Sequence, residues 1–379
     1  MRKRLFSLLI SLVLVSGSVS AEESGFKFKV LKEVEATPVK HQAKTGTCWA
    51  FATNSFIESE LLRMGKGQHD ISEMFAVRMV YPQKIRNFVR LHGKTQFGPG
   101  SLSGDLMRVV RQHGMLPESV YSGRHVGESR HNHQEMDAVL EAGLKALVAN
   151  KSGKLSVAWP EAFEGILDAY LGKVPENFLY RGKTYTPRSF ADELGIRPED
   201  YMEFTSYTHH PFYEKFSLKV PDNWAHNTYY NLPLDEFMQV ADNALESGFT
   251  VAWDGDVSEK SFHRDREIAI LPKKDWEDRT KEEQKDICKA PEPELKVTQE
   301  VRQQHYDNYT SGDDHLMHAT GLAEDQNGTR FYIVKNSWGT KEKKNQGSIY
   351  MSEPYFRSKA VSIMVHKDAV PAEILAKLR

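Results

Sequence analysis

Residues 42–52 read Gln42-Ala43-Lys44-Thr45-Gly46-Thr47-Cys48-Trp49-Ala50-Phe51-Ala52. Far downstream, His318 precedes Ala319, and residues 335–339 read Lys335-Asn336-Ser337-Trp338-Gly339. Together the three stretches hold a sulfur nucleophile, an imidazole base, an amide that can orient the base, and a glutamine amide that can donate to an oxyanion. Acyl transfer through a thiol requires these groups. We therefore expect Cys48, His318, Asn336 and Gln42 to meet in one catalytic site.

The nucleophile is expected at the start of a helix. Thr47 is suited to be the N-cap, which places Cys48 in the first turn, where the positive end of the helix dipole favours a thiolate. Gln42 lies six positions earlier, so a loop can bring its side-chain amide beside the sulfur. The second oxyanion donor would be the Cys48 backbone amide.

Two histidines compete for the role of the base. His318 directly precedes the small and apolar run 319–322, which suits a buried strand that aims an imidazole at a cleft. His315 follows two acidic residues, Asp313 and Asp314, so we expect it to be solvated. These four side chains form an alternative metal site, but no third His or Cys follows at ligand spacing. We expect no metal, and His318 as the base.

The downstream tripeptide at residues 336–338 fits the role of an orienting group. Asn336 would accept the second imidazole N–H and fix the tautomer of the base. Trp338 would cover that hydrogen bond and exclude water, which strengthens it. As an isolated tripeptide, the same residues would only indicate a turn with a packed aromatic.

The N-terminus has the pattern of a secretory signal. Residues 2–4 are basic, residues 5–15 form an almost unbroken apolar run, and Val-Ser-Ala at 19–21 supplies small residues for cleavage. The apolar run is shorter than the about 20 residues of a membrane-spanning helix. We therefore expect cleavage after Ala21 and an exported protein, periplasmic or secreted, with no membrane attachment.

Composition narrows the range of partners. Loss of the three basic leader residues changes the formal net charge from −2 to −5, which argues against binding to nucleic acid or an anionic membrane. Only two cysteines are present, Cys48 and Cys288; one disulfide is possible, but the charged surroundings of Cys288 indicate a bystander. No cofactor is implied.

The apolar pattern predicts an α+β chain. A helix is expected after Cys48, ending at the glycines of 65–67, and a second over 105–113. Two further helical stripes lie between residues 128 and 195, where the apolar residues are expected to be packing surfaces. Residues 249–253 and 331–335 are rich in β-branched and aromatic residues and predict strands.

The motifs at 42–52 and 335–339 resemble the papain superfamily, and within it the bleomycin hydrolase/aminopeptidase C branch. His318 follows Cys48 by about 270 residues, whereas roughly 130–150 separate these groups in papain and the cathepsins. The helical middle supplies that excess, as an insertion does in this branch. Segments at 186–190, 252–257 and 347–356 are also similar to the branch. The departures are Thr47, residues 97–101, a shorter chain and the export signal.

The resemblance implies a papain-like fold of two halves. Residues 22–127 would form the helical half, 128–200 a helical insertion, and 201–379 the β-rich half with the C-terminal tail. It also implies an aminopeptidase acting on peptides and assembling as a hexamer. The carboxylate of Arg379, the last residue, would hold the substrate's free amine, although a frayed terminus is the alternative.

Two other functions stay open at this point. An endopeptidase or dipeptidyl peptidase on the same fold differs only in what the cleft admits. A catalytically silent peptide-binding protein would keep the fold, but each expected catalytic residue type is present in this chain.

Overall fold

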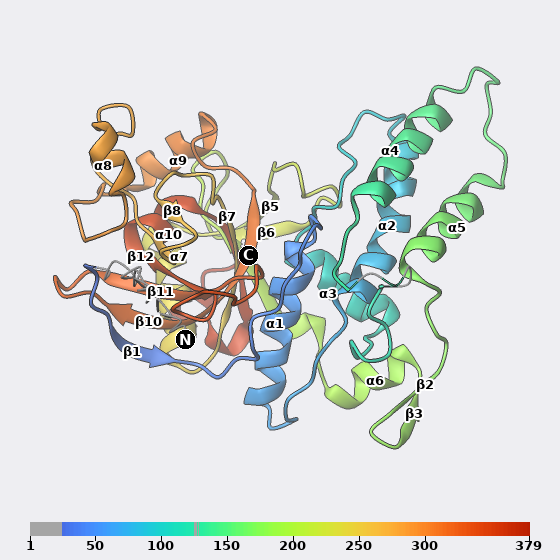
Figure 1. Ribbon diagram of the computed structural model, residues 1–379, viewed down its shortest axis with the longest axis horizontal. Helices are drawn as coiled ribbons and strands as arrows, with labels where there is room; N and C mark the ends of the chain where they lie inside the picture. The colour runs from blue at the N-terminus through green and yellow to red at the C-terminus, as the bar shows by residue number, and fades with distance from the viewer. Residues whose placement is uncertain (1–24, 125–126, 128) are drawn as a thin grey trace, which may run out of the picture.

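The computed structural model describes residues 25–124, 127 and 129–379. The expected signal at residues 1–21 lies outside the described residues. A large sheet with its own helices forms one half of the molecule, and a group of helices forms the other (Figure 1). Helix α1 (Cys48–Arg63) runs between the two halves.

The helical half follows α1 in the chain. Its other helices are α2 (Glu73–Arg90), α3 (Ser103–His113), α4 (Gln134–Val148), α5 (Trp159–Leu171) and α6 (Pro187–Leu194). A short hairpin of β2 (Phe178–Tyr180) and β3 (Lys183–Tyr185) precedes α6. The helices expected after Cys48 and over 105–113 are confirmed as α1 and α3.

Helix α2 has no counterpart among the sequence predictions. Pro82 lies inside it, and proline argues against a helix interior because it lacks an N–H and crowds the preceding turn. The helix nevertheless begins with a favourable cap, since the Ser72 side chain accepts a hydrogen bond of 3.0 Å from the Phe75 amide. Its apolar face is buried against α1, so tertiary packing outweighs the local signal.

The β-rich half is built on one mixed sheet. Its strands in chain order are β1 (Lys29–Glu33), β4 (Tyr201–Thr205), β5 (Lys215–Ser217), β6 (Thr228–Asn231), β7 (Val251–Gly255), β8 (Phe262–His263), β9 (Ile268–Ala269), β10 (His315–Glu324), β11 (Arg330–Lys335), β12 (Ser348–Ser352) and β13 (Ala360–His366). They lie in the order β5-β6-β4-β13-β7-β10-β11-β12-β9-β8, and β1 also pairs with β10. The strands expected at 249–253 and 331–335 are found as β7 and β11.

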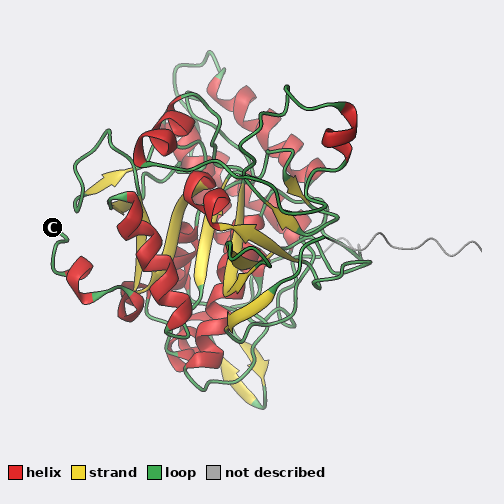
Figure 2. Cartoon of the chain, turned by 90° about the vertical axis from the view of Figure 1, so that its left-hand side faces the viewer, coloured by secondary structure: helices red, strands yellow, loops and turns green. Residues whose placement is uncertain are grey.

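Further helices accompany the sheet: α7 (Leu234–Glu246), α8 (Lys281–Lys285), α9 (Gln299–Asp307), α10 (Glu353–Lys359) and α11 (Ala372–Leu375), with 3₁₀ turns η1 (Pro198–Asp200) and η2 (Lys367–Ala369). Figure 2 shows helices in front of the yellow strands, and the C-terminus at the margin of the molecule. Within the described residues, no helix has the length and apolar character needed to cross a membrane.

The two faces of the sheet pack against different cores. On β10, Leu316 belongs to the core shared with α1, whereas Met317 and Ala319 belong to the core formed with α7 and α10. This alternation follows from the two-residue period of a strand. From His315 to Ala319, parity therefore assigns each β10 residue to the α1 side or to the α7 side. A register shift between Ala319 and Gly321 then reverses the alternation, and Leu322 joins the core formed with α7.

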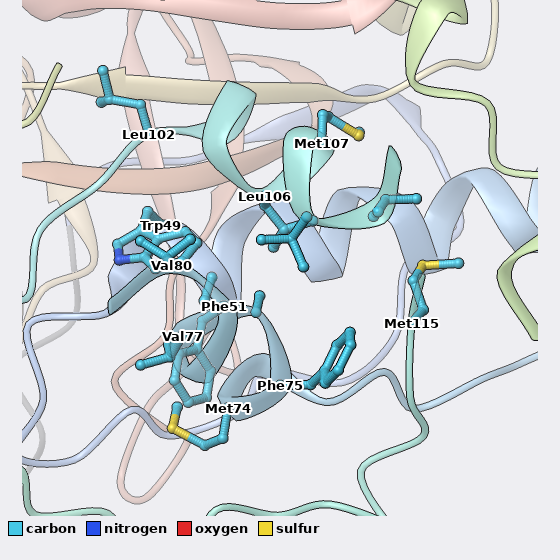
Figure 3. Packing of buried hydrophobic residues seen from close by; sticks show 14 of the residues in the cluster. Trp49, Phe51, Met74, Phe75, Val77, Val80, Leu102, Leu106, Met107 and Met115 are labelled. Carbon is cyan, nitrogen blue, oxygen red and sulfur yellow. The ribbon is translucent and has the colours of Figure 1, made fainter. Parts of the chain in front are cut away.

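Helix α1 is buried almost along its whole length, from Cys48 to Leu61. Trp49 and Phe51 pack among Met74 and Val77 of α2 and Leu106 of α3 (Figure 3). The polar groups of a helix enclosed on all sides need hydrogen-bond partners inside the protein, because an unsatisfied buried group costs about 1–3 kcal/mol.

Glu58 shows how these pairs hold α1 in place. Its carboxylate accepts from Thr37 Oγ1 at 2.5 Å, from Lys40 Nζ at 3.0 Å and from the Ile71 amide at 2.9 Å, while the residue itself is 0% exposed. The segment before α1 and the segment after it are thus tied to one carboxylate.

Replacing this carboxylate should weaken the whole fold. Glu58→Ala leaves the Thr37 hydroxyl and the Ile71 amide without their acceptor and removes one of the three carboxylates paired with Lys40, so it should lower the free energy of unfolding by about 2–4 kcal/mol. Glu141→Ala removes an exposed i,i+4 pair with Lys145 on α4 and should cost less than ~0.5 kcal/mol. Urea unfolding followed by circular dichroism measures both; equal midpoints for the two variants would contradict this role.

Candidate active site

Cys48 is the first residue of α1, as expected. Thr47 occupies the N-cap position with φ −111° and ψ 30°, yet its side chain makes no capping hydrogen bond. Instead, Thr47 Oγ1 pairs with Thr45 Oγ1 at 2.6 Å. The first amide groups of the helix therefore lack a side-chain cap, which leaves the helix start suited to an anion.

The sulfur of Cys48 lies against the start of β10. Burial raises the pKa of the thiol to about 12, and a backbone hydrogen bond from Leu316 opposes that rise. Three carboxylates act in the same direction as burial: Asp222, Asp313 and Asp254. The resting group is therefore a neutral thiol, and the negative side chains around it were not expected from the sequence.

His315 is the imidazole paired with Asn336. Its Nε2 lies 2.8 Å from Asn336 Oδ1, and its ring stacks on Trp338 with centroids 4.7 Å apart and an interplanar angle of 26°. Burial lowers the pKa of His315 to about 4, while the Asn336 hydrogen bond acts to raise it. Because His315 directly precedes Leu316, the imidazole and the Cys48 sulfur meet at the same end of β10.

The prediction that His318 is the base is wrong in its geometry. His318 is 0% exposed, and its Nδ1 lies 2.8 Å from Ser55 Oγ in the middle of α1. Lys335 Nζ lies 2.6 Å from the same Ser55 oxygen. Burial, together with the positive charge of Lys335, holds the pKa of His318 well below its usual range. His318 belongs to the packing behind the site.

Strand parity explains this error. His318 pairs with Lys335 across β10 and β11, so both side chains point to the α1 face. Asn336 is one residue further and has the opposite parity, shared with His315. The composition of the run after His318 carried no information on the face. The register of β10 against β11, which depends on the fold, places His315 and Asn336 on the same face.

The Gln42 side chain is held in the loop before Cys48 by Thr45 and Ser337. Ser337 Oγ donates to Gln42 Oε1 at 2.5 Å, and Gln42 Nε2 donates to Thr45 O at 2.8 Å. The Gln42 amide also donates to Ser337 O at 2.9 Å. The side-chain oxygen is thereby fixed, and one N–H of the amide remains for a substrate oxygen. Ser337, inside the same tripeptide as Asn336 and Trp338, positions Gln42, a role that the sequence analysis missed.

Arg379 is not at this site, contrary to the expectation from the resemblance. Its backbone amide donates to Tyr213 O at 2.9 Å, its guanidinium lies 3.8 Å from Glu214, and its side chain is 80% exposed. These contacts precede β5, the edge strand, and four strands separate β5 from β10. At ~4.8 Å for each neighbouring strand, that offset is roughly 24 Å. The tail packs on the edge of the sheet instead of entering the cleft.

Cys288 is separate from this chemistry. It is 1% exposed, its sulfur donates to Ser261 O at 3.1 Å, and burial raises the pKa of its thiol. Both cysteines are free. Among the described residues, no group of three His, Cys, Asp or Glu side chains has an arrangement that could hold a metal ion.

The chain is similar to known proteins in sequence and in fold. The family described as Peptidase C1-like matches residues 175–379. The chain is 24% identical over 400 residues to "Aminopeptidase C" of Streptococcus thermophilus, covering 94% of this chain and 86% of the relative. The crystal structure of PepW from Lactobacillus rhamnosis HN001 superposes with a TM-score of 0.71 at 20% identity, covering 92% of this chain and 84% of that one.

Alkylation of Cys48 should separate the two histidines without any substrate. Iodoacetamide at neutral pH should label Cys48 in preference to Cys288, and His315→Ala should slow that labelling by about 10²-fold, since a neighbouring base generates the thiolate. His318→Ala should leave the rate within about threefold and lower the melting temperature instead, because it opens a buried contact with Ser55. Peptide mass spectrometry measures both rates; slower labelling in His318→Ala alone would restore the original assignment.

Proposed function

Because this chain belongs to the Peptidase C1-like family, we propose that it is a cysteine peptidase that removes residues from the N-termini of peptides through an acyl-thioester on Cys48. The observation that carries the catalytic part is the His315–Asn336 hydrogen bond, stacked under Trp338 beside the first residue of α1. The relative named Aminopeptidase C supports the aminopeptidase part.

In this proposal the first step moves one proton. Burial favours a neutral Cys48 thiol and a neutral His315 imidazole, since it raises the pKa of the first and lowers that of the second. As Cys48 attacks the scissile carbonyl, its proton passes to His315, and the imidazolium is stabilised by the Asn336 oxygen. Trp338 stacks on that imidazole and limits the access of water to the hydrogen bond.

The carbonyl oxygen becomes negative during the attack. Gln42 Nε2 and the Cys48 backbone amide are the donors available for it, and a missing oxyanion donor typically costs about 10²–10³ in rate. Ser337 holds the glutamine in register with the helix start. His315 then donates its proton to the leaving amine, and water hydrolyses the thioester with the imidazole again acting as base.

The position of the chain end bears on exo-specificity. In the structure the Arg379 backbone hydrogen-bonds to Tyr213 at the sheet edge, so its carboxylate is not the group that would hold a substrate amine. An aminopeptidase on this chain needs another anion near Cys48. An endopeptidase, the second candidate, needs a cleft that accepts neutral peptide groups on both sides of the cut.

Substitution of His315 and of Asn336 should rank their roles in the reaction. His315→Ala should lower kcat by about 10²–10⁴-fold, because the thiol loses its base. Asn336→Ala should have a smaller effect on kcat, because Asn336 orients the base and transfers no proton. His318→Ala, assayed at a temperature where it stays folded, serves as the control and should retain kcat within about threefold. Hydrolysis of leucyl-methylcoumarylamide measures each; an inactive His318→Ala with an active His315→Ala would overturn the assignment.

Blocking the substrate's amine should separate the two modes of cleavage. Peptides with a free N-terminus should lose residues one at a time from that end, whereas their N-acetylated versions should be stable by at least about 30-fold in kcat/KM, since amine recognition contributes about 2 kcal/mol or more. Mass-spectrometric mapping of a peptide library in both forms measures this. Internal cuts at equal rates in acetylated peptides would establish the endopeptidase.

We also propose that the protein is exported, which the basic, apolar and small-residue pattern of residues 1–21 supports. N-terminal sequencing of the protein from culture fractions would test it, with Glu22 as the expected first residue. The hexamer implied by the resemblance remains a prediction that light scattering can test.

A further inference from the structure

We propose that three aspartates, Asp222, Asp254 and Asp313, form the subsite that binds the substrate's free α-ammonium group. This inference rests on the proposed aminopeptidase function and names the anion that the chain end does not provide. We call the three residues the aspartate group.

The aspartate group is placed beside the nucleophile by three separate segments. Asp254 lies on β7 opposite Leu316 of β10, the residue whose backbone hydrogen-bonds to the Cys48 sulfur. Asp313 precedes His315 by two residues, and the Asp222 amide donates to Asp313 Oδ2 at 3.3 Å. The negative charges of all three raise the pKa of Cys48. They therefore act within electrostatic reach of the reacting sulfur.

Segment 97–101 holds Asp222 in this place. Trp49 Nε1, one residue after the nucleophile, donates to Pro99 O at 3.0 Å, and a Cβ on Gly46 would lie 2.4 Å from the Pro99 ring. A Cβ on the neighbouring Gly100 would lie 1.9 Å from Asp222 Oδ2. Segment 97–101 thus packs closely on the start of α1 on one side and on the Asp222 carboxylate on the other.

The aspartate group has unsatisfied acceptors. Asp254 is 3% exposed; its Oδ2 accepts from Ser362 Oγ at 3.2 Å, but its Oδ1 has no hydrogen-bond donor among the described residues. Oδ1 of Asp313 is likewise buried without a donor. None of the ion pairs among the described residues includes a member of the group. Two carboxyl oxygens with no donor require either a shared proton or a cationic ligand.

Lys84 does not fill this requirement. Its Nζ donates to the Gly100 carbonyl, and burial lowers its pKa to about 8. Its charge acts on Asp222 to lower the pKa of that carboxyl, but none of the ion pairs among the described residues joins the two. In the free protein Asp254 and Asp313 interact through their side chains, and burial is the chief cause that raises the pKa of both carboxyls, to about 7 for Asp313; both effects favour one proton shared by the pair.

A substrate α-ammonium fits both the charge and the position. It is separated from the scissile carbonyl carbon by a single Cα, so an enzyme that removes one residue needs its anion close to the nucleophile. The ammonium brings three donors and a positive charge, and so can replace the proton that the carboxyl pair holds in the free protein. An acetylated or internal substrate would place a neutral amide there, leaving the carboxyl oxygens unpaired, which disfavours its binding.

The test compares two substrates that differ only in the amine. Leucyl-methylcoumarylamide carries it, and the 4-methylpentanoyl amide is the same molecule without it. Wild type should prefer the amine by about 10²-fold in kcat/KM. Asp222→Asn and Asp313→Asn, at partly exposed positions, should each reduce that preference by about tenfold or more. The preference is the ratio of the two kcat/KM values, so a change in the Cys48 pKa, which acts on both substrates, cancels from it. Asp254 is buried, so Asp254→Asn should reduce the same preference, and its melting temperature is measured to separate this effect from a loss of folding.

The matched control is Asp235→Asn, the same change at a side chain that is 89% exposed on α7. It should leave the preference unchanged. Equal losses for both substrates in Asp222→Asn and Asp313→Asn would mean a structural role and overturn the inference, as would an unchanged preference. If wild type itself cleaves the two substrates equally, the aminopeptidase proposal fails; if it cleaves neither those amides nor the peptide library, the peptidase proposal fails.

Discussion

The enclosure of α1 between the sheet and the other helices constrains everything else in this molecule. A helix buried on every side has little solvent to satisfy its polar side chains, so several of them find partners from other segments. Glu58 gathers Thr37, Lys40 and the Ile71 amide, and Ser55 meets His318 and Lys335 from the sheet. These contacts fix the position of α1 along its axis and its rotation about that axis, and thereby the position of Cys48 in its first turn.

Local sequence was informative where the function of a residue depends on its immediate neighbours. The helix start at Cys48, the loop carrying Gln42 and the tripeptide from Asn336 to Trp338 all lie within a few residues of the features that position them. The choice between His315 and His318 was different in kind. It depends on which face of a central strand each residue occupies, and that face is decided by pairing with β7 and β11.

Two other features depended on long-range packing and were missed for the same reason. Helix α2 contains Pro82, and only burial against α1 and α3 explains why the helix continues through it. The carboxyl end was assigned to the cleft by resemblance, but its last residues pack on Tyr213 and Glu236 at the sheet edge. Asp222, Asp254 and Asp313 lie far apart in the chain and carry no motif, so no reading of the sequence would have placed them around Cys48.

The hydrogen bonds between Gln42 and Ser337 also connect the two halves of the molecule. Gln42 precedes α1, Ser337 follows β11, and the two residues exchange a backbone and a side-chain bond across the line where the halves meet. The nucleophile therefore comes from one half, the imidazole from the other, and the oxyanion donor is clamped by both. If the halves separated by the length of one hydrogen bond, Cys48 and His315 would no longer face one another. The catalytic groups are therefore aligned only while the two halves of the molecule stay in contact.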